Sequence, residues 1–420
     1  MTSPPPSAPT LQALSHVRVL DLSRVLAGPW ASQMLADLGA DVIKVERPGS
    51  GDDTRGWGPP NLKDREGHPL PDSAYYLCAN RNKRSVAIDF TRPEGQRLLQ
   101  QMATRCDVVI ENFKPGALAR YGLDPATLMG LNPRLVYCSI TGFGQTGPYA
   151  PRAGYDFLMQ GMGGLMSITG HPDGEPGGGP MKVGVALTDI LTGLHATTAI
   201  LAALAHRDHA GPQGQGQHID LALLDVQVAC LANQTMNYLY GERVPGRLGN
   251  AHPNVVPYQD FPTADGDMIL AVGNDGQFAK LCELLGHPEW AADDRFATNA
   301  ARVDHRRTLI PLLRQQTVQR PTAEWIAQLE AAGVPCGPIN NLAQVFADPQ
   351  VRARGMQISM PHPQAGEIPL VASPLRLSGT PVTYRRAPPR LGEHTREVLA
   401  ELLDLDAAAC SRLAAEGVVG

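Results

Sequence analysis

The sequence predicts an α/β protein, with a parallel sheet in the first half and a smaller α+β unit in the second half. In the first half, short apolar runs alternate with helical segments of about ten residues, which is typical of βαβ units with right-handed crossovers. The 43 glycines and 37 prolines indicate many turns and extended connections rather than a helical bundle. A chain of 420 residues is long enough for two domains.

Strands and helical segments are expected in alternation along the first half. Pro29 suits the first position of a helix, and Gly39 is a typical helix terminator. Pro93 followed by Glu94 marks the start of another helix. In chain order we expect a strand at 17–22, a helix at 29–39, a strand at 41–46, a helix at 93–105, a strand at 107–113, a helical turn at 125–131 and a strand at 134–140.

The second half contains the smaller α+β unit and then a proline-rich tail. A loop-like segment begins at Gly246 and leads into a short strand and three helices. The tail from Val345 has short apolar runs and many prolines, which indicates extended chain wrapping over another surface. The strand is expected at 268–272 and the helices at 276–285, 302–318 and 322–332.

Composition and charge exclude several classes of protein. The chain has 43% hydrophobic and 18% charged residues, as an ordinary globular protein does, and a formal net charge of −5. This charge gives no general attraction to nucleic acid or to an anionic membrane. The 7 cysteines form no CxxC pair, and the histidines lack metal-ligand spacing. We therefore expect reduced thiols, a cytoplasmic location and no metal site.

No segment predicts a membrane protein. Residues 1–13 are uncharged and rich in proline and serine, so we expect a disordered leader rather than a signal peptide. The longest uncharged stretch, 190–206, is short for a bilayer span and contains Gly193 and His195. We expect a buried core helix there, with His195 in the core.

Asp189 is the strongest candidate for a reactive residue. It is the only carboxylate in the apolar run from 184 to 206. An aspartate in front of an apolar helix is a good N-cap, because it accepts hydrogen bonds from the first turn. A carboxylate at the mouth of such a helix is also partly stripped of water, which raises its reactivity as a nucleophile. The local pattern leaves both interpretations open.

Ligands of parallel α/β sheets bind at the carboxyl ends of the strands, so the loops at 23–28, 47–51 and 112–116 are the expected binding loops. Arg47 ends a strand, where it could bind a phosphate. For most other basic residues of this region we expect a solvated surface, although the loop 80–85 could hold a charged cofactor tail. These residues are Lys44, Arg55, Arg81, Lys83 and Arg84.

The segment 142–147, GFGQTG, matches the G-x-G-x-x-G pattern and follows a strand. Pro148 and Pro151 come directly after it, so no helix N-terminus is available for a pyrophosphate. We therefore expect no NAD or FAD site. A tight glycine turn that lets a ligand or a neighbouring chain approach closely is the better interpretation.

Eight segments together resemble the class III CoA-transferase family, also called the CaiB/BaiF family, over residues 14–402. Each segment is weak alone, but their order and spacing are jointly specific. They are VLDLSRVLAGP (19–29), GADVIKVERPGSGDDTR (39–55), NRNKRSVAIDF (80–90), DVVIENFKPGAL (107–118), ITGFGQTGPY (140–149), ALTDILTGLHA (186–196), GVPCGPINN (333–341) and LGEHT (391–395).

The resemblance implies an interlocked homodimer of ring-like subunits. Each subunit would have a Rossmann-like large domain with a parallel sheet, built from both chain ends, and a smaller α+β domain in the middle. On this sequence the large domain falls at 14–225 and 345–420, and a linker with the small domain falls at 226–344. The proline-rich tail should then return to the large domain.

The resemblance also implies the site. In this family the aspartate of the TD-x-x-TG segment is the nucleophile, which matches Asp189. Coenzyme A is then a substrate, and no cofactor is bound permanently. Positions that match family residues in the CoA groove or near the thioester are Leu26, Ala27, Arg47, Asn112, Phe113, Lys114 and Arg120.

The segment 227–285 looks most like family members that move CoA between small dicarboxylates. This implies succinyl-CoA as the donor and glutarate or a hydroxymethylglutarate-type acid as the acceptor. A second carboxylate needs a cation or a polar cradle. Tyr155, Arg247 and His252 are the candidate substrate residues.

Two other functions stay open on the sequence. The same fold hosts α-methylacyl-CoA racemases, whose G-H-D segment is replaced here by Gly154-Tyr155-Asp156. A tyrosine, with an ordinary pKa of about 10, is a poor base for an α-proton. The other function is a non-catalytic CoA-binding module, which the complete set of segments and the presence of Asp189 disfavour.

Overall fold

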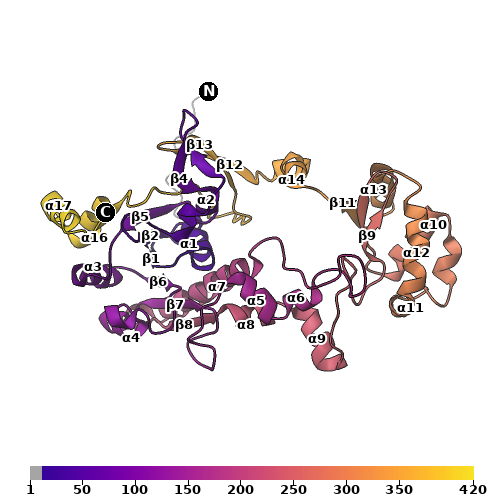
Figure 1. The fold of residues 1–420 in the computed structure, drawn as a ribbon, viewed down its shortest axis with the longest axis horizontal. Helices are drawn as coiled ribbons and strands as arrows, with labels where there is room; N and C mark the ends of the chain where they lie inside the picture. Colours follow the sequence, from indigo (N-terminus) through magenta and orange to yellow (C-terminus); the bar gives the residue numbers. More distant parts are fainter. Residues whose placement is uncertain (1–11) are drawn as a thin grey trace. The chain divides into compact units, whose positions relative to one another are not determined.

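The computed structural model describes residues 12–420, which divide into two compact units (Figure 1). The first unit comprises the chain up to Gly164, Val183–Thr235 and Arg352–Gly420, and the second comprises Leu165–Lys182 and Met236–Val351. Most of the expected leader, residues 1–11, lies outside the described residues. The sequence placed 165–182 in the large domain. In the structure this segment belongs to the second unit, where Arg247 donates to the carbonyls of Ser167 and His171.

A six-stranded parallel sheet forms the centre of the first unit, so the predicted α/β class is confirmed. Its strand order is β5-β2-β1-β6-β7-β8. The chain fills one half of the sheet outward from β1 and then returns to β6 on the other side of β1, which makes β1/β6 the switch point where such sheets bind ligands. The strands are β1 (Arg18–Asp21), β2 (Asp41–Glu46), β5 (Lys83–Ala87), β6 (Val108–Glu111), β7 (Val136–Thr141) and β8 (His218–Ala222).

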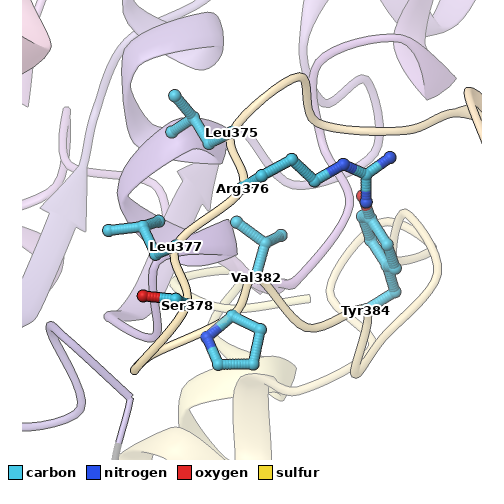
Figure 2. A pocket seen from close by; sticks show the side chains of 7 residues that line it. Leu375, Arg376, Leu377, Ser378, Val382 and Tyr384 are labelled. Atoms are coloured by element: carbon cyan, nitrogen blue, oxygen red, sulfur yellow. The ribbon is translucent and has the colours of Figure 1, made fainter. Parts of the chain in front are cut away.

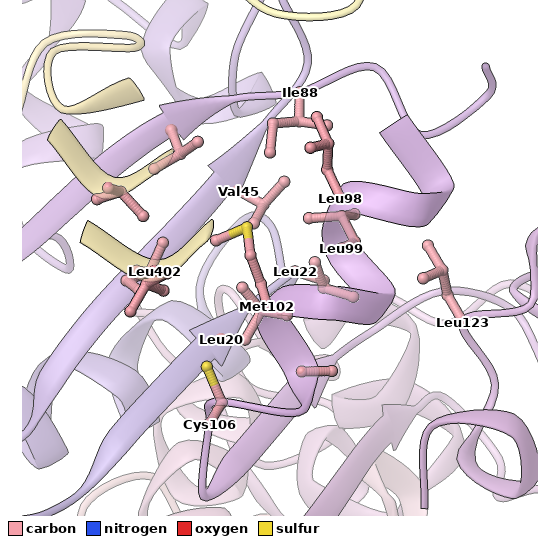
Figure 3. Packing of buried hydrophobic residues seen from close by; sticks show 14 of the residues in the cluster. Leu20, Leu22, Val45, Ile88, Leu98, Leu99, Met102, Cys106, Leu123 and Leu402 are labelled. Atoms are coloured by element: carbon pink, nitrogen blue, oxygen red, sulfur yellow. The ribbon is translucent and has the colours of Figure 1, made fainter. Parts of the chain in front are cut away.

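Helices cover both faces of this sheet, because successive residues of its strands are apolar and point to opposite sides. Leu20 and Val109 pack on one face, while Val19 and Val108 pack on the other. On the first face Leu20 of β1 lies in one apolar cluster with Leu98 of α3 and Leu402 of α16 (Figure 3). That face is covered by α3 (Pro93–Ala103), α4 (Pro125–Leu131), α16 (Thr395–Leu403) and α17 (Ala407–Ala415). The other face is covered by α1 (Ala27–Asp37), α5 (Asp156–Met162), α7 (Leu187–His209) and α8 (Leu223–Ala229).

Helix α7 is the core helix that the apolar stretch predicted. Within residues 12–420 it is the one helix long and apolar enough to cross a membrane, but Ala196 and Ile200 are buried against the sheet. His195 lies on its exposed side, where Nδ1 is 2.8 Å from the carbonyl oxygen of Leu191. The expected core position of His195 is therefore wrong, because it falls on the face of the helix opposite to the packed one.

Five basic side chains of the first half are buried in ion pairs, contrary to the expected solvated surface. The pairs are Lys44–Asp52 (2.8 Å), Arg55–Glu46 (2.7 Å), Arg81–Asp37 (2.5 Å), Lys83–Asp21 (3.3 Å) and Arg84–Asp41 (2.5 Å). The loop 80–85 thus belongs to a buried polar network and is not free to hold a cofactor tail. Arg47, in contrast, is exposed just after β2.

The second unit has a small antiparallel sheet packed against helices. Its strands are β9 (Tyr258–Pro262), β10 (Asp267–Ala271) and β11 (Cys336–Pro338), in the order β11-β10-β9. Phe261, Phe278 and Trp325 fill the core between sheet and helices. The helix expected at 302–318 is divided at His305. The helices are α10 (Asp275–Leu285), α11 (Asn299–Asp304), α12 (Arg306–Thr317) and α13 (Thr322–Ala331).

The tail returns to the first unit, but only part of it is extended. It forms the hairpin β12 (Gln357–His362) and β13 (Gly366–Val371), an irregular segment, and then α16 and α17. The two helices follow the proline-rich part of the tail and were not predicted. Val398, Leu399 and Leu402 of α16 nevertheless form an apolar stripe that packs on the sheet.

A surface pocket of about 280 Å³ lies along the irregular part of the tail (Figure 2). All of its lining residues come from 375–384, among them Leu375, Arg376 and Tyr384. None of the predicted site residues lines this pocket.

Candidate active site

Asp189 lies in the first turn of α7, as the third residue of the helix. The helix begins at Leu187, and its N-cap is Ala186, which has no capping side chain. The expected N-cap role of Asp189 is therefore wrong. Because α7 leads back to the start of β8 in a parallel sheet, its first turn must lie at the carboxyl edge of the sheet.

The Asp189 carboxylate is half-buried and carries no hydrogen bond from any residue in 12–420. Its own backbone N–H donates to Oδ1 of Asp156, at 3.3 Å. Burial raises the pKa of Asp189, and the charge of Asp156 raises it further, to about 7. A carboxylate that is desolvated, unpaired and unusually basic is poised to act as a nucleophile.

Tyr75 lies near this carboxylate and is in ring contact with Trp57, and the sequence analysis predicted neither residue. Tyr75 belongs to α2 (Ala74–Leu77), and its ring meets that of Trp57 edge-on, with centroids 5.2 Å apart. Burial and then the charge of Asp189 raise the pKa of Tyr75 to about 12, so its hydroxyl stays protonated. Tyr75 is therefore a neutral hydrogen-bond donor near Asp189.

The start of α1 packs against α7, next to the first turn of α7, which holds Asp189. Leu26 and Ala27 are buried there, and α1 begins at Ala27, two residues before the expected start. Gly193 permits the approach, because a Cβ on it would lie 2.8 Å from the carbonyl oxygen of Ala27. The residues near Asp189 thus include the predicted pair Leu26 and Ala27.

Replacing Gly193 with alanine should push α7 away from α1. The new methyl group would also meet Cβ of Trp30 at 3.1 Å, and overpacking of this kind costs about 1–3 kcal/mol in the free energy of unfolding. Gly130 of α4 is a matched control, because a Cβ there has open space. Urea unfolding should show that Gly193→Ala destabilises the protein and that Gly130→Ala does not. Equal stability of the two variants would contradict this packing.

The predicted CoA residues gather at the carboxyl ends of β1, β2 and β6. Arg47 is exposed after β2, and Asn112 follows β6. Asn112 is tied to the loop after β1, since its Oδ1 accepts from the N–H of Arg24 and its Nδ2 donates to the carbonyl of Arg24. The guanidinium of Arg24 lies 5.2 Å from the ring centre of Phe113. Arg24 was not predicted, although it stands in an expected binding loop.

The remaining CoA candidates continue the same edge. Lys114 is exposed directly after Phe113, and Arg120 lies over the ring of Tyr121, at 4.6 Å. The N–H of Phe113 donates to the buried carboxylate of Glu111, at 2.8 Å, which fixes the turn. The edge therefore offers two exposed basic side chains, Lys114 and Arg47, beside an aromatic ring.

The three candidate substrate residues are divided between the units. Tyr155 is exposed and is the N-cap of α5, directly before Asp156. Arg247 and His252 belong to the second unit. Arg247 is engaged with the segment 167–173, where it donates to two backbone carbonyls and pairs with Asp173, and Nδ1 of His252 accepts from the N–H of Asn254. Their role toward a second carboxylate stays a prediction.

The glycine turn after β7 does not lead directly into a helix, as a dinucleotide fingerprint would. No helix follows it before α5, and Gly144 and Gly147 have positive φ angles of 87° and 90°. A Cβ on Gly142 would lie 2.6 Å from Cα of Gly154, so the glycines allow two chain segments to pass closely. In the described part of the chain, one group of side chains, Asp64, Glu66 and His68, has metal-ligand proximity, and it lies in the turn between β3 (Asn61–Lys63) and β4 (Pro69–Ser73).

The model of CoA-transferase family III matches residues 14–395. The chain belongs to CoA-transferase family III. It is 55% identical over 389 residues to the succinate–glutarate CoA-transferase of Agrobacterium fabrum, covering 93% of this chain and 95% of the relative. It is 44% identical over 409 residues to human succinyl-CoA:glutarate CoA-transferase, covering 97% and 90%. A crystal structure of a CaiB/BaiF family protein from Brucella suis has 51% identity and a TM-score of 0.80, covering 93% and 99%.

These similarities confirm the family that the eight sequence segments predicted. The protein is an enzyme of the CoA-transferase class, and CoA thioesters are the substrates of this class. A non-catalytic binding module is thereby set aside. The Agrobacterium and human relatives are named CoA-transferases, and Tyr155 stands where a racemase would carry histidine.

Proposed function

We propose that this enzyme transfers coenzyme A from succinyl-CoA to glutarate or a similar small dicarboxylate, with Asp189 as the nucleophile. The substrate pair is supported by the names of the relatives at 55% and 44% identity. The observation that carries the nucleophile role is the unpaired, half-buried carboxylate of Asp189 at the carboxyl edge of the sheet. CoA is the group that is transferred, and the proposed reaction uses no permanently bound cofactor.

The reaction begins when an oxygen of Asp189 attacks the thioester carbonyl of succinyl-CoA. The C–S bond breaks, CoA leaves as a thiolate, and a mixed anhydride remains on Asp189. A thiol has an ordinary pKa of about 8.5, so the thiolate is a good leaving group. The thiolate then attacks the aspartyl carbonyl. Succinate leaves with the electrons of the broken C–O bond, and an aspartyl-CoA thioester forms.

The acceptor acid completes the cycle by the reverse route. Its carboxylate attacks the aspartyl thioester and expels the thiolate, which forms a second anhydride on Asp189. The thiolate then attacks the acceptor's acyl carbon, which gives the new acyl-CoA and restores the carboxylate of Asp189. No proton is gained or lost overall. Water must be excluded, because both anhydrides hydrolyse readily.

The roles at the carboxyl edge follow from charge and position. Arg47, Lys114 and Arg120 are exposed cations that can bind the CoA phosphates. Phe113 offers an aromatic face for the adenine, and Leu26 and Ala27 lie where the thioester should reach Asp189. Tyr75 can donate a hydrogen bond to the acyl group, since its hydroxyl keeps its proton.

The transfer rate should depend on pH through Asp189 itself. The pKa of Asp189 is raised to about 7, so a large part of the enzyme is protonated and unreactive below that pH. Initial kcat/KM for succinyl-CoA should therefore rise with pH through about 7 and level off above it. An acid limb near the ordinary carboxyl pKa of about 4 would contradict the basic nucleophile.

A matrix of acyl-CoA donors against free acids, separated by liquid chromatography, tests the substrate proposal. Succinyl-CoA with glutarate should give glutaryl-CoA and succinate in equal amounts, faster than monocarboxylate acceptors react. Deuterium incorporation at the α-carbon of a branched acyl-CoA, without any transfer, would instead support the racemase.

We further propose that the working enzyme is a homodimer in the cytoplasm. Seven free cysteines suit a reducing compartment. Large apolar side chains such as Leu239, Tyr240 and Val244 are exposed, and a second copy of the chain would cover such groups. Sedimentation analysis should give twice the chain mass, and a monomer at micromolar concentration would contradict the dimer.

A further inference from the structure

The first turn of α7 is capped by a carboxylate from another helix. Asp156, the first residue of α5, accepts hydrogen bonds at Oδ1 from the N–H groups of Thr188, at 2.7 Å, and Asp189, at 3.3 Å. The helix's own N-cap, Ala186, has no side-chain oxygen. The first N–H groups of a helix have no partner within the helix and favour a negative charge. Asp156 supplies that charge from a position outside the helix.

Asp156 is itself held in place. Gln160, one turn further along α5 and fully buried, donates from Nε2 to Oδ2 of Asp156, at 2.7 Å. Its Oε1 accepts from the N–H of Val183, at 2.8 Å. Gln160 therefore fixes both the carboxylate and the chain that leads into α7. Both oxygens of Asp156 thus accept hydrogen bonds, which fixes the orientation of its carboxylate.

This arrangement has two effects on Asp189. Its neighbouring N–H groups are occupied by Asp156, so they do not stabilise the Asp189 carboxylate. Two carboxylates also share a half-buried site, where like charges raise each other's energy. Acylation removes the charge from Asp189 and relieves this repulsion. The repulsion thus raises the energy of the free enzyme more than that of the acylated enzyme, which favours attack on the thioester.

We propose that Asp156 is a positioning residue for acyl transfer: it caps the helix of the nucleophile, and its fixed negative charge activates Asp189. This inference rests on the proposed function of Asp189 as the nucleophile. Asp156 itself forms no bond to the substrate in this scheme and acts through Asp189.

Other titratable groups around α7 do not take this role. Of all of them, only Asp156 contributes to the raised pKa of Asp189. Tyr75 of α2 is neutral, and Asp37 of α1 is paired with Arg81. The others on elements that pack against α7 are Tyr137 and Cys138 of β7, His218 and Asp220 of β8, and Asp225 of α8.

The test separates the charge of Asp156 from its capping oxygen. Asp156→Asn keeps an acceptor for the two N–H groups and removes the charge. Its acid limb in kcat/KM against pH should move to lower pH by on the order of one unit. Its plateau rate should fall severalfold, because a less basic carboxylate is a weaker nucleophile. Asp156→Glu keeps the charge and should keep the acid limb of the wild type.

Matched controls complete the experiment. Asp124 caps α4 by accepting from the N–H of Thr127, so Asp124→Asn makes the same chemical change on the opposite face of the sheet from α5 and α7 and should leave the pH profile unchanged. Thermal melting checks that each variant folds, and Asp156→Ser provides a second neutral variant with a short side-chain oxygen. A profile of either neutral variant that coincides with the wild type would overturn the activating role.

Failure of this inference can be told apart from failure of the proposed function. Wild-type enzyme incubated with succinyl-CoA and then hydroxylamine should carry a label on Asp189, read by mass spectrometry. An unlabelled wild type would remove the proposed nucleophile. If the wild type is labelled but the dependence of kcat/KM on pH is the same in the neutral variants as in the wild type, only the proposed role of Asp156 is contradicted.

Discussion

Asp189→Ala should lower CoA transfer by a factor on the order of a thousand or more, because no neighbouring group can form the acyl-enzyme in its place. Asp156 is the nearest carboxylate, but both of its oxygens are engaged in hydrogen bonds. Tyr75 stays protonated and is a poor nucleophile. The expected loss is in kcat, measured as glutaryl-CoA formed from succinyl-CoA and glutarate.

The same variant should not lose stability. The folded-state pKa of Asp189, about 7, lies above its unfolded value of about 4, so its ionisation costs folding free energy as pH rises through this window. Asp189→Ala should therefore melt at the same temperature as the wild type or higher at pH 8. Asp225→Asn, an exposed carboxylate change on α8, is the matched control and should keep full activity. Substantial transfer by Asp189→Ala would refute the nucleophile role.

Asp52→Ala should destabilise the protein by about 3–5 kcal/mol, because it leaves the ammonium of Lys44 buried without its partner. Lys44 and Asp52 are fully buried and 2.8 Å apart. Asp52 also accepts from the N–H and the hydroxyl of Thr54. Urea unfolding at pH 7 measures the effect. Asp53→Ala, next in the chain, removes an exposed carboxylate paired with Arg24 and should cost less than about 1 kcal/mol.

Low pH should reduce the difference in the free energy of unfolding between Asp52→Ala and the wild type. Burial alone would raise the pKa of Asp52, but the charge and hydrogen bond of Lys44 lower it to about 2. A lowered folded-state pKa stabilises the protein above the unfolded value of about 4, and this contribution is lost as pH falls through 2. Wild-type stability should therefore drop more steeply than that of Asp52→Ala between pH 4 and 2. Parallel curves would contradict the ion pair.

Asp189 and the sheet could be predicted because their signals are local. An isolated carboxylate in an apolar run stands out, and the strands that became β1, β2, β6 and β7 are short apolar runs between turns. The three expected binding loops followed from the rule that parallel sheets bind ligands at the carboxyl ends of their strands. This rule places the loops after β1, β2 and β6 at the same edge of the sheet. Arg24 could have been found by the same rule.

The buried ion pairs could not be predicted, because a charged residue in the sequence carries no sign of its distant partner. Arg81 finds Asp37, and Lys83 finds Asp21, only after β1, α1 and β5 have packed. In the sequence, each of these basic residues has the features of a solvated surface residue, because only the folded chain brings its carboxylate partner beside it.

Asp156 was overlooked for a similar reason. The sequence analysis used it only as part of the segment that replaces a racemase motif, whereas the role we propose for it depends on the packing of α5 against the start of α7. The same packing explains why Asp189 is not the N-cap. With Asp156 serving the free N–H groups, the helix begins at Leu187 and the Asp189 carboxylate stays unbound.

Mass spectrometry of the enzyme after brief exposure to succinyl-CoA and hydroxylamine tests the central claim most directly. The account predicts that the peptide containing residues 187–195 carries a hydroxamate on Asp189, that the label vanishes in Asp189→Ala, and that free CoA is released in proportion. Efficient transfer by an enzyme that never becomes labelled at Asp189, or a label on another side chain, would contradict it.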